Sequence, residues 1–281
     1  LKYQLDEFSS MKASYNRTRQ YIHLVSNTTT TVPIDIWKPS GMYVDPATAD
    51  QVALGYFRNF NSNKYEFSGE IYYKEFQNLL DYVDGANLIL NESIETELLS
   101  GDGRAYGFET QIKKKSGIFT GWISYTLART ERQVTGINNS EWYPSNYDKL
   151  HDVSVVGIYT VNDKWELSAN FAFMSGRPIT YPDGKYEQNG GQLIIPNYGN
   201  RNGARLTAYH RLDFAATLTP RKNKDRRWQA EWVFSIYNVY GRRNAYSINF
   251  RQNEDNPSIT EAYRLSILGT MLPSVGYNFK F

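Results

Sequence analysis

The chain has 281 residues and a formal net charge of only +2, because 31 lysine and arginine residues nearly balance 29 aspartate and glutamate residues. This balance excludes a general electrostatic attraction to nucleic acid, and the lack of cysteine excludes both disulfide bonds and a zinc–thiolate site. The mean hydropathy is -0.58, and no apolar run approaches the ~20 residues of a transmembrane helix.

Aromatic residues are frequent for so hydrophilic a chain. They make up 15% of the residues and include 23 tyrosines. High aromatic content without general hydrophobicity fits strands that are apolar on one face only, as in transmembrane β-barrels. A soluble β-sandwich with aromatic-rich strands has the same composition, so composition leaves both classes open.

Segments of alternating apolar and polar residues recur along the whole chain. Successive side chains of a strand point to opposite faces, so this alternation predicts strands with one apolar face. In chain order the predicted strands lie near 11–15, 52–60, 65–74, 106–112, 119–127, 153–161, 165–173, 211–218, 228–236 and 274–281. The predicted fold class is all-β, an antiparallel up-and-down transmembrane β-barrel with about ten strands in this chain.

The predicted connections fall into two classes that alternate along the chain. Short turns lie at 61–64, 115–117, 162–164 and 220–227, and long connections lie near 18–50, 78–103, 132–150, 176–206 and 241–261. Outer-membrane barrels have short periplasmic turns and long extracellular loops. Loops over ~15 residues are uncommon in soluble domains. The sorting therefore favours the barrel.

The chain ends in a strand with an aromatic face. Val275, Tyr277, Phe279 and Phe281 alternate with small or polar residues. Chain ends fray unless they are tied down, and a barrel ties down its last strand by pairing it with its first. We therefore expect Val275, Tyr277 and Phe279 to face lipid, and Phe281 to lie in the aromatic girdle.

Several stretches together resemble the C-terminal barrel of TonB-dependent outer-membrane receptors, in particular those of Bacteroides-type bacteria. The terminal strand is similar to the signal that the barrel-insertion machinery reads. The stretches are 20–23 (QYIH), 70–74 (EIYYK), 101–109 (GDGRAYGFE), 121–127 (GWISYTL), 147–152 (YDKLHD), 175–178 (SGRP), 237–240 (YNVY) and 273–281 (PSVGYNFKF). They cover nearly the whole chain in the right order.

The resemblance implies a barrel of about 22 strands in the outer membrane of a Gram-negative bacterium, with lipid around it. It implies an N-terminal plug domain and energy from TonB–ExbB–ExbD. Residues 1–281 would be the C-terminal part of the barrel, without the plug domain and the N-terminal strands. The implied activity is import of a siderophore, glycan, vitamin or peptide, with neither catalysis nor a cofactor. In the SusC-like branch a SusD-like surface lipoprotein would take part.

Aromatic residues in the long loops are the candidate ligand contacts, because exposed rings there can stack on sugars or hydrophobic nutrients. Packing between loops is the alternative explanation for the same residues. Arg177 could hold an acidic ligand, or it could anchor its loop to a neighbouring carboxylate. We predict no catalytic residue and no metal ligand. The candidate ligand contacts are Trp37, Trp142, Tyr147, Arg177, Tyr181 and Tyr198.

Charged residues on the predicted lumen face are expected to form a hydrated lattice of ion pairs facing the plug domain. They are Glu66, Glu70, Glu109, Glu166, Arg211, Asp213 and Glu231. The basic segment 221–227 is expected to be a solvated turn rather than a nucleic-acid site, because no stacking aromatics interleave with its charges. The glycines of 101–107 are followed by a predicted strand and not by a helix, so they predict a turn into a strand rather than a phosphate loop.

Two other functions stay open at this stage. A complete ten-stranded outer-membrane enzyme, such as an omptin-like protease, needs acidic residues and a histidine that converge at the extracellular rim. Only His151, near Asp148 and Asp152, offers such a histidine. A soluble, aromatic-rich lectin is the third possibility, although the sorted loops and the terminal strand argue against it.

Overall fold

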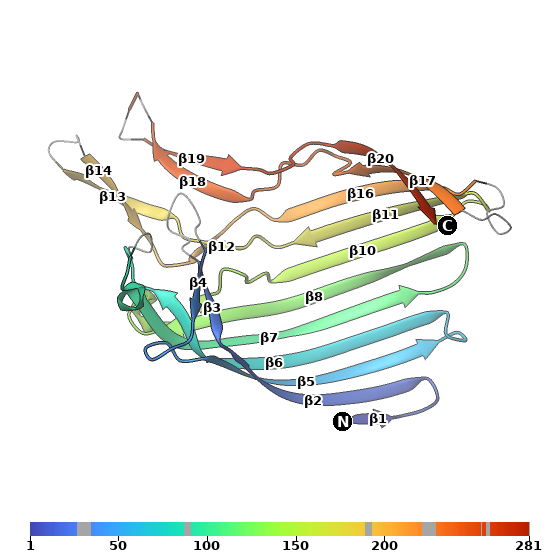
Figure 1. The fold of residues 1–281 in the computed structure, drawn as a ribbon, viewed down its shortest axis with the longest axis horizontal. Coiled ribbons are helices and arrows are strands. Elements are labelled where there is room, and N and C mark those ends of the chain that lie inside the picture. The colour runs from blue at the N-terminus through green and yellow to red at the C-terminus, as the bar shows by residue number, and fades with distance from the viewer. Residues whose placement is uncertain are drawn as a thin grey trace.

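The computed structural model describes residues 1–26, 35–86, 91–188, 193–220, 229–253, 255–256 and 259–280, and its fold is all-β (Figure 1). The ten predicted strands are confirmed, each paired antiparallel with the next long strand. They are β2 (Ser9–Gln20), β5 (Ala47–Phe60), β6 (Tyr65–Tyr82), β7 (Leu98–Lys114), β8 (Phe119–Val134), β10 (His151–Thr160), β11 (Trp165–Met174), β16 (Tyr209–Leu218), β17 (Gln229–Tyr237) and β20 (Leu272–Lys280).

Two short strands complete this sheet: β1 (Lys2–Gln4) pairs with β2, and β9 (Tyr143–Pro144) pairs with β8. The remaining elements lie in the long connections, at the end of the sheet opposite the short turns (Figure 1). Four two-stranded pairs are formed by β3 (Ile22–Ser26) with β4 (Asp35–Pro39), β12 (Pro178–Ile179) with β15 (Ala204–Arg205), β13 (Pro182–Gln188) with β14 (Leu193–Tyr198), and β18 (Ser247–Gln252) with β19 (Thr260–Leu265). Two 3₁₀ turns are η1 (Ile94–Glu97) and η2 (Asn138–Ser140).

Strands β6, β7 and β8 extend further toward the long loops than the sequence predicted. Pairing continues where the alternation of apolar and polar residues stops, for example between Arg104 and Glu131. Gly101 and Gly103 therefore lie inside β7 rather than at a loop exit, which corrects the predicted connection 78–103. A Cβ atom at Gly101 would lie 2.4 Å from the carbonyl oxygen of Gln133. Glycine permits this close approach between the β7 and β8 backbones.

One face of the sheet is apolar and exposed, and we call it the apolar belt. Directly paired residues share a face, so rows such as Leu54, Ile71 and Phe108 run across neighbouring strands. Many of its side chains are exposed to solvent. They include Tyr15, Val52, Leu54, Ile71, Tyr73, Tyr106, Phe108, Ile112, Phe119, Ile123, Leu127, Tyr159, Phe214, Trp232, Phe234, Val275, Tyr277 and Phe279.

Aromatic rings gather on the apolar belt toward the short-turn end. Phe60 stacks on Tyr65 with ring centroids 5.6 Å apart, and Trp232 lies 4.7 Å from Tyr277. The three apolar residues expected on the exposed face of the last strand do lie there, paired with residues of β17. Phe281, predicted for the girdle, lies outside the described residues.

The opposite face, here the polar face, carries all seven charged residues predicted for the lumen. Two ion pairs are formed there: Glu66 with Lys115 at 2.8 Å, and Arg211 with Asp213 at 2.9 Å. Glu70 and Glu109, however, stand directly opposite each other in register, beside a hollow of about 290 Å³. The predicted lattice is therefore only partly paired, because β6 and β7 bring two carboxylates together.

The sheet is open among the described residues. Its edge strand β20 pairs with β17, its other edge is β1, and β1 and β20 lie on opposite sides of the curved sheet (Figure 1). The expected pairing of the last strand with the first is thus absent, because the curvature of these strands does not bring the edges together. No helix in the described part of the chain is long and apolar enough to cross a membrane.

Buried apolar clusters lie at the long-loop end. One contains Val25, Val44, Leu80 and Tyr82, which join the β3–β4 hairpin to the end of β6. The other contains Val134, Ile137 and Tyr143, beyond β8. Burial is therefore concentrated where the loops meet, and this region holds the candidate site.

Candidate functional site

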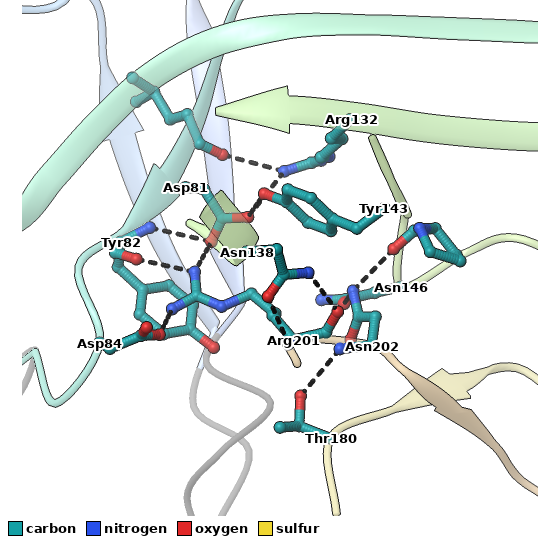
Figure 2. A network of polar contacts seen from close by, with 12 residues as sticks. Asp81, Tyr82, Asp84, Arg132, Asn138, Tyr143, Asn146, Thr180, Arg201 and Asn202 are labelled. Carbon is teal, nitrogen blue, oxygen red and sulfur yellow. Dashed lines mark hydrogen bonds and ion pairs between the residues drawn. The ribbon is translucent and has the colours of Figure 1, made fainter. Parts of the chain in front are cut away.

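The long loops are tied together around one buried arginine, Arg201, in the connection between β14 and β15. Its side chain is only 3% exposed. The guanidinium Nη1 donates to Asp81 Oδ1 at 2.6 Å and to the Tyr82 carbonyl at 2.7 Å, and Nη2 donates to Asp84. The guanidinium also lies 4.2 Å from the centre of the Tyr82 ring. Figure 2 shows these groups converging from separate connections.

Asp81 is the common acceptor of this cluster. Its second oxygen accepts a hydrogen bond of 2.6 Å from the hydroxyl of Tyr143, and Arg132 lies 4.0 Å away. Burial, and then the adjacent Asp81 carboxylate, raise the pKa of the Tyr143 phenol. Burial also disfavours the charged form of Arg201, but the two aspartates and Tyr82 outweigh it and raise the arginine pKa. The Tyr143 hydroxyl and the Arg201 guanidinium therefore keep their protons and act as hydrogen-bond donors to Asp81.

Two asparagines hold the backbone around Arg201 (Figure 2). Asn138 accepts from the Arg201 N–H at 2.7 Å and donates to the Arg201 carbonyl at 2.9 Å. The side chain of Asn202 donates to the Pro144 carbonyl at 2.8 Å and to Asn146 at 2.6 Å. The connections 83–97, 135–150 and 175–208 are thereby fixed to one another. We call this cluster the loop clasp: Asp81, Tyr82, Asp84, Arg132, Asn138, Tyr143, Asn146, Thr180, Arg201 and Asn202.

A second polar cluster adjoins the loop clasp. Asp148 is fully buried, accepts a hydrogen bond of 2.7 Å from the Thr130 N–H, and pairs with Arg205. Asp148 therefore bonds the corner where the loop re-enters the sheet. Glu131 pairs with Arg104 at 2.8 Å, and Arg104 in turn stacks 4.2 Å from the Trp142 ring.

The candidate ligand contacts divide into exposed and packed residues. Trp37 and Tyr147 are 65% and 61% exposed, and Tyr198 is 37% exposed. Trp37 lines an apolar hollow of about 640 Å³ with Gln20, Tyr21 and Ile22. Trp142 is stacked on Arg104, a residue of strand β7. The six candidates are spread over three connections and do not converge on one pocket among the described residues.

Arg177 and Tyr181 join two of the long loops. Arg177 donates to the Tyr246 carbonyl and lies 5.9 Å from the Tyr246 ring. Tyr181 packs edge-on against Phe250 with ring centroids 5.2 Å apart, and burial raises its pKa. Arg177 thus anchors its loop, as one interpretation predicted, but it does so on a backbone carbonyl and a ring rather than on a carboxylate.

The acid–histidine constellation of the enzyme alternative is not formed. His151 is paired with Leu127, which places it on the face of the apolar belt, and its Nδ1 lies 2.9 Å from the Tyr125 hydroxyl. Asp148 is bonded to Thr130 and Arg205 instead. Asp152, the residue after His151, points to the opposite face of the sheet. In the described part of the chain, no group of three or more His, Asp and Glu side chains could hold a metal ion.

No sequence pattern predicted the loop clasp. Arg201 and Asp81 are 120 residues apart, and no periodic pattern links them. The only local sign is the run Asn200–Gly203, whose composition predicts a turn and says nothing of its partners.

Comparison with solved structures identifies the fold. Over 99% of its length the chain matches the ferric-catecholate import receptor Fiu of E. coli K12, with a TM-score of 0.58 and 13% identity. The sheet has the fold of part of a TonB-dependent receptor barrel. The chain also matches the ferripyoverdine receptor of the outer membrane of Pseudomonas aeruginosa over 99% of its length, with a TM-score of 0.57 and 11% identity. It matches the FrpB iron transporter of Neisseria meningitidis over 99% of its length, with a TM-score of 0.59 and 10% identity.

The chain covers 34%, 31% and 37% of these three receptors, so it spans about a third of their length. Identities this low show the fold alone. No protein-family model matches the sequence, and no curated protein matches it.

Proposed function

We propose that this chain is the C-terminal part of the barrel of a TonB-dependent outer-membrane importer. The observation that carries the proposal is the exposed apolar belt, which crosses the long strands while the other face is polar. Such a face is stable against lipid and costly against water. The sorting of short turns and long loops to opposite ends supports the same conclusion.

The rest of the barrel and the plug domain belong to the proposal as well. The open edges at β1 and β20 need partner strands, because unpaired backbone groups are costly in lipid. Further strands of the same barrel would pair with these edges, and the polar face would then line a lumen that holds a plug domain. TonB–ExbB–ExbD would act through that plug domain.

The long loops would form the receptor surface for the nutrient. Trp37, Tyr147 and Tyr198 offer exposed rings there. Trp142 is instead engaged by strand β7, and Arg177 and Tyr181 are engaged by the long loop between β17 and β20. Ferric siderophores are the first ligand class to test, because the structural neighbours are ferric-siderophore and iron receptors. Glycans, with a SusD-like lipoprotein, are the class to test next, because the Bacteroides-type receptors that several stretches of the sequence resemble include a SusC-like branch.

The native protein tests the proposal by its size and its location. An antibody against residues 272–280 would probe soluble, inner-membrane and outer-membrane fractions on a denaturing gel. We expect an outer-membrane band at about three times the 32.5 kDa of this chain. A band near 32.5 kDa would contradict the larger barrel and with it the proposed importer. A protein confined to the soluble fraction would overturn the membrane assignment.

Uptake then tests the transport function. A strain lacking the gene should lose TonB-dependent growth on one ligand class, and the full-length protein should restore it. Growth that is unchanged on siderophores, glycans, vitamins and peptides would argue against an importer.

A further inference from the structure

Two lysines lie above aromatic rings at the short-turn end of the sheet. The ammonium of Lys114 lies 5.6 Å from the centre of the Phe119 ring, and that of Lys64 lies 6.0 Å from the Tyr65 ring. Lys114 is paired in register with Tyr65, so it shares the face of the apolar belt. The N–H of Lys115 donates to the Lys64 carbonyl at 2.9 Å, which joins the two turns into one surface.

These lysines have no carboxylate partner among the described residues. The neighbouring Glu66 faces the polar side of the sheet, where it pairs with Lys115 at 2.8 Å. Lys64 and Lys114 are half-buried, and the ammonium group of each lies over an aromatic ring. The surface therefore combines two uncompensated positive charges with the aromatic edge of the belt.

The long-loop end of the same face is arranged differently. Arg17 pairs there with Asp50 at 2.7 Å, and Arg104 pairs with Glu131 at 2.8 Å. These two arginines are thus paired within the sheet. Lys64 and Lys114 instead leave two positive charges available to an anionic group from outside the protein.

We propose that Lys64 and Lys114 bind the phosphate headgroup of an anionic phospholipid in the leaflet at the short-turn end. This inference rests on the proposed membrane location of the sheet. The lipid's acyl chains would lie along the apolar belt, next to Tyr65 and Phe119, while its phosphate lies between the two ammonium groups. A zwitterionic lipid carries its own cation beside the phosphate, so the site prefers phosphatidylglycerol to phosphatidylcholine.

Native mass spectrometry of the full-length protein, released from detergent, tests this preference with dioleoyl phosphatidylglycerol and dioleoyl phosphatidylcholine. We expect the double variant Lys64→Gln/Lys114→Gln to lose about fivefold in phosphatidylglycerol affinity for each lysine. Binding of phosphatidylcholine should not change. The charge-retaining variant Lys64→Arg/Lys114→Arg should keep the preference.

Lys113→Gln is the matched control, because Lys113 adjoins Lys114 in β7 but points to the polar face. An equal loss in this control would show a net-charge effect and overturn the site, as would a wild type without any lipid preference. Soluble inorganic phosphate at millimolar concentration should not compete; if it does, the site binds free phosphate and the lipid assignment is wrong.

The wild type provides a second test that needs no variant. Its preference for phosphatidylglycerol should fall as salt rises, because both charges lie at the surface. A preference insensitive to salt would contradict the ion-pair basis. Every measurement is made on protein that shows the heat-dependent gel shift of a folded barrel. A protein that never enters the outer membrane would instead refute the proposed function.

Discussion

Arg201 shows how one side chain can organise several loops. Its guanidinium is buried, and the cost of burying a charge is offset only when the charge is paired and hydrogen-bonded. Asp81 and Asp84 supply the opposite charge, and Tyr82 supplies a ring face. Asn138 fixes the backbone on both sides of the residue. The position of Arg201 is thus set by groups from the end of β6 and from the connections 83–97 and 135–150, which local sequence cannot reveal.

Replacing Arg201 by methionine should release the loop clasp. The change removes the cation but leaves Asp81 buried, and breaking a buried pair in this way costs about 3–5 kcal/mol. Hydrogen exchange should show faster exchange in connections 83–97, 135–150 and 175–188, with the ten long strands unchanged. Arg177→Met is the matched control, since Arg177 is exposed and bonds one carbonyl, and it should cost less than about 1 kcal/mol. Equal exchange in the two variants would contradict the central role of Arg201.

His23 should make the β3–β4 hairpin sensitive to acid. Burial lowers the pKa of His23 below its usual 6.5, although a hydrogen bond with the Asp45 backbone opposes the shift. The unfolded chain then binds a proton more readily than the folded hairpin does, so stability rises with pH. The contribution is complete above pH 6.5 and is lost as pH falls below that value.

Protection factors of the backbone amides in 22–26 and 35–39 would measure this effect between about pH 7.5 and pH 5. We expect protection to fall with pH in the wild type. It should stay level in His23→Gln, which keeps a polar side chain but cannot titrate. A fall of the same size in both proteins would assign the effect to another group.

At the scale of the element, alternation predicted the strands well where one face is apolar and the other polar. It failed beyond the apolar belt, where β7 begins at Leu98 although its alternation begins at Tyr106. In this segment the neighbouring residues Leu98 and Leu99 pack against two different buried clusters, so 98–105 shows no alternation of apolar and polar side chains, although its backbone still pairs. The hairpins within the loops were missed for the same reason, and the contacts of the loop clasp are too distant in sequence for any local pattern.

Close approach of β7 and β8 should make Gly101 intolerant of any side chain. A Cβ atom there would lie 2.4 Å from the Gln133 carbonyl oxygen and 2.7 Å from a methyl group of Val134. Gly101→Ala should therefore push the strands apart and cost about 1–3 kcal/mol. Gly41→Ala is the control, because a Cβ at Gly41 has nothing within 4 Å and should be nearly neutral. Denaturant midpoints of the two variants in the same detergent would decide; equal midpoints would contradict the steric argument.

At the scale of the whole molecule, apolar surface and burial are separated. The apolar side chains of the long strands are exposed, while the buried clusters lie under the loops. In water so large an apolar face would be an aggregation surface, because hydrophobic burial stabilises in proportion to area. In a bilayer the lipid chains would cover the same face. The loops would lie in water, so they need the buried clusters as a core of their own. The distribution of side chains therefore supports the proposed membrane around the sheet.

Adjacent residues on opposite faces of β8 test this conclusion. Ile123 lies in the apolar belt and is 55% exposed, whereas Ser124 lies on the polar face. If lipid covers the belt, Ile123→Lys places a charge in hydrocarbon and should cost about 2–4 kcal/mol, while Ser124→Lys should be tolerated in a hydrated lumen. The measurement is the free energy of unfolding of the full-length protein from liposomes, by denaturant titration. In a soluble sheet the outcome would differ: an exposed lysine at 123 would face water and leave stability within about 0.5 kcal/mol of the wild type. That result, or a larger loss at Ser124 than at Ile123, would mean that the exposed face does not contact lipid.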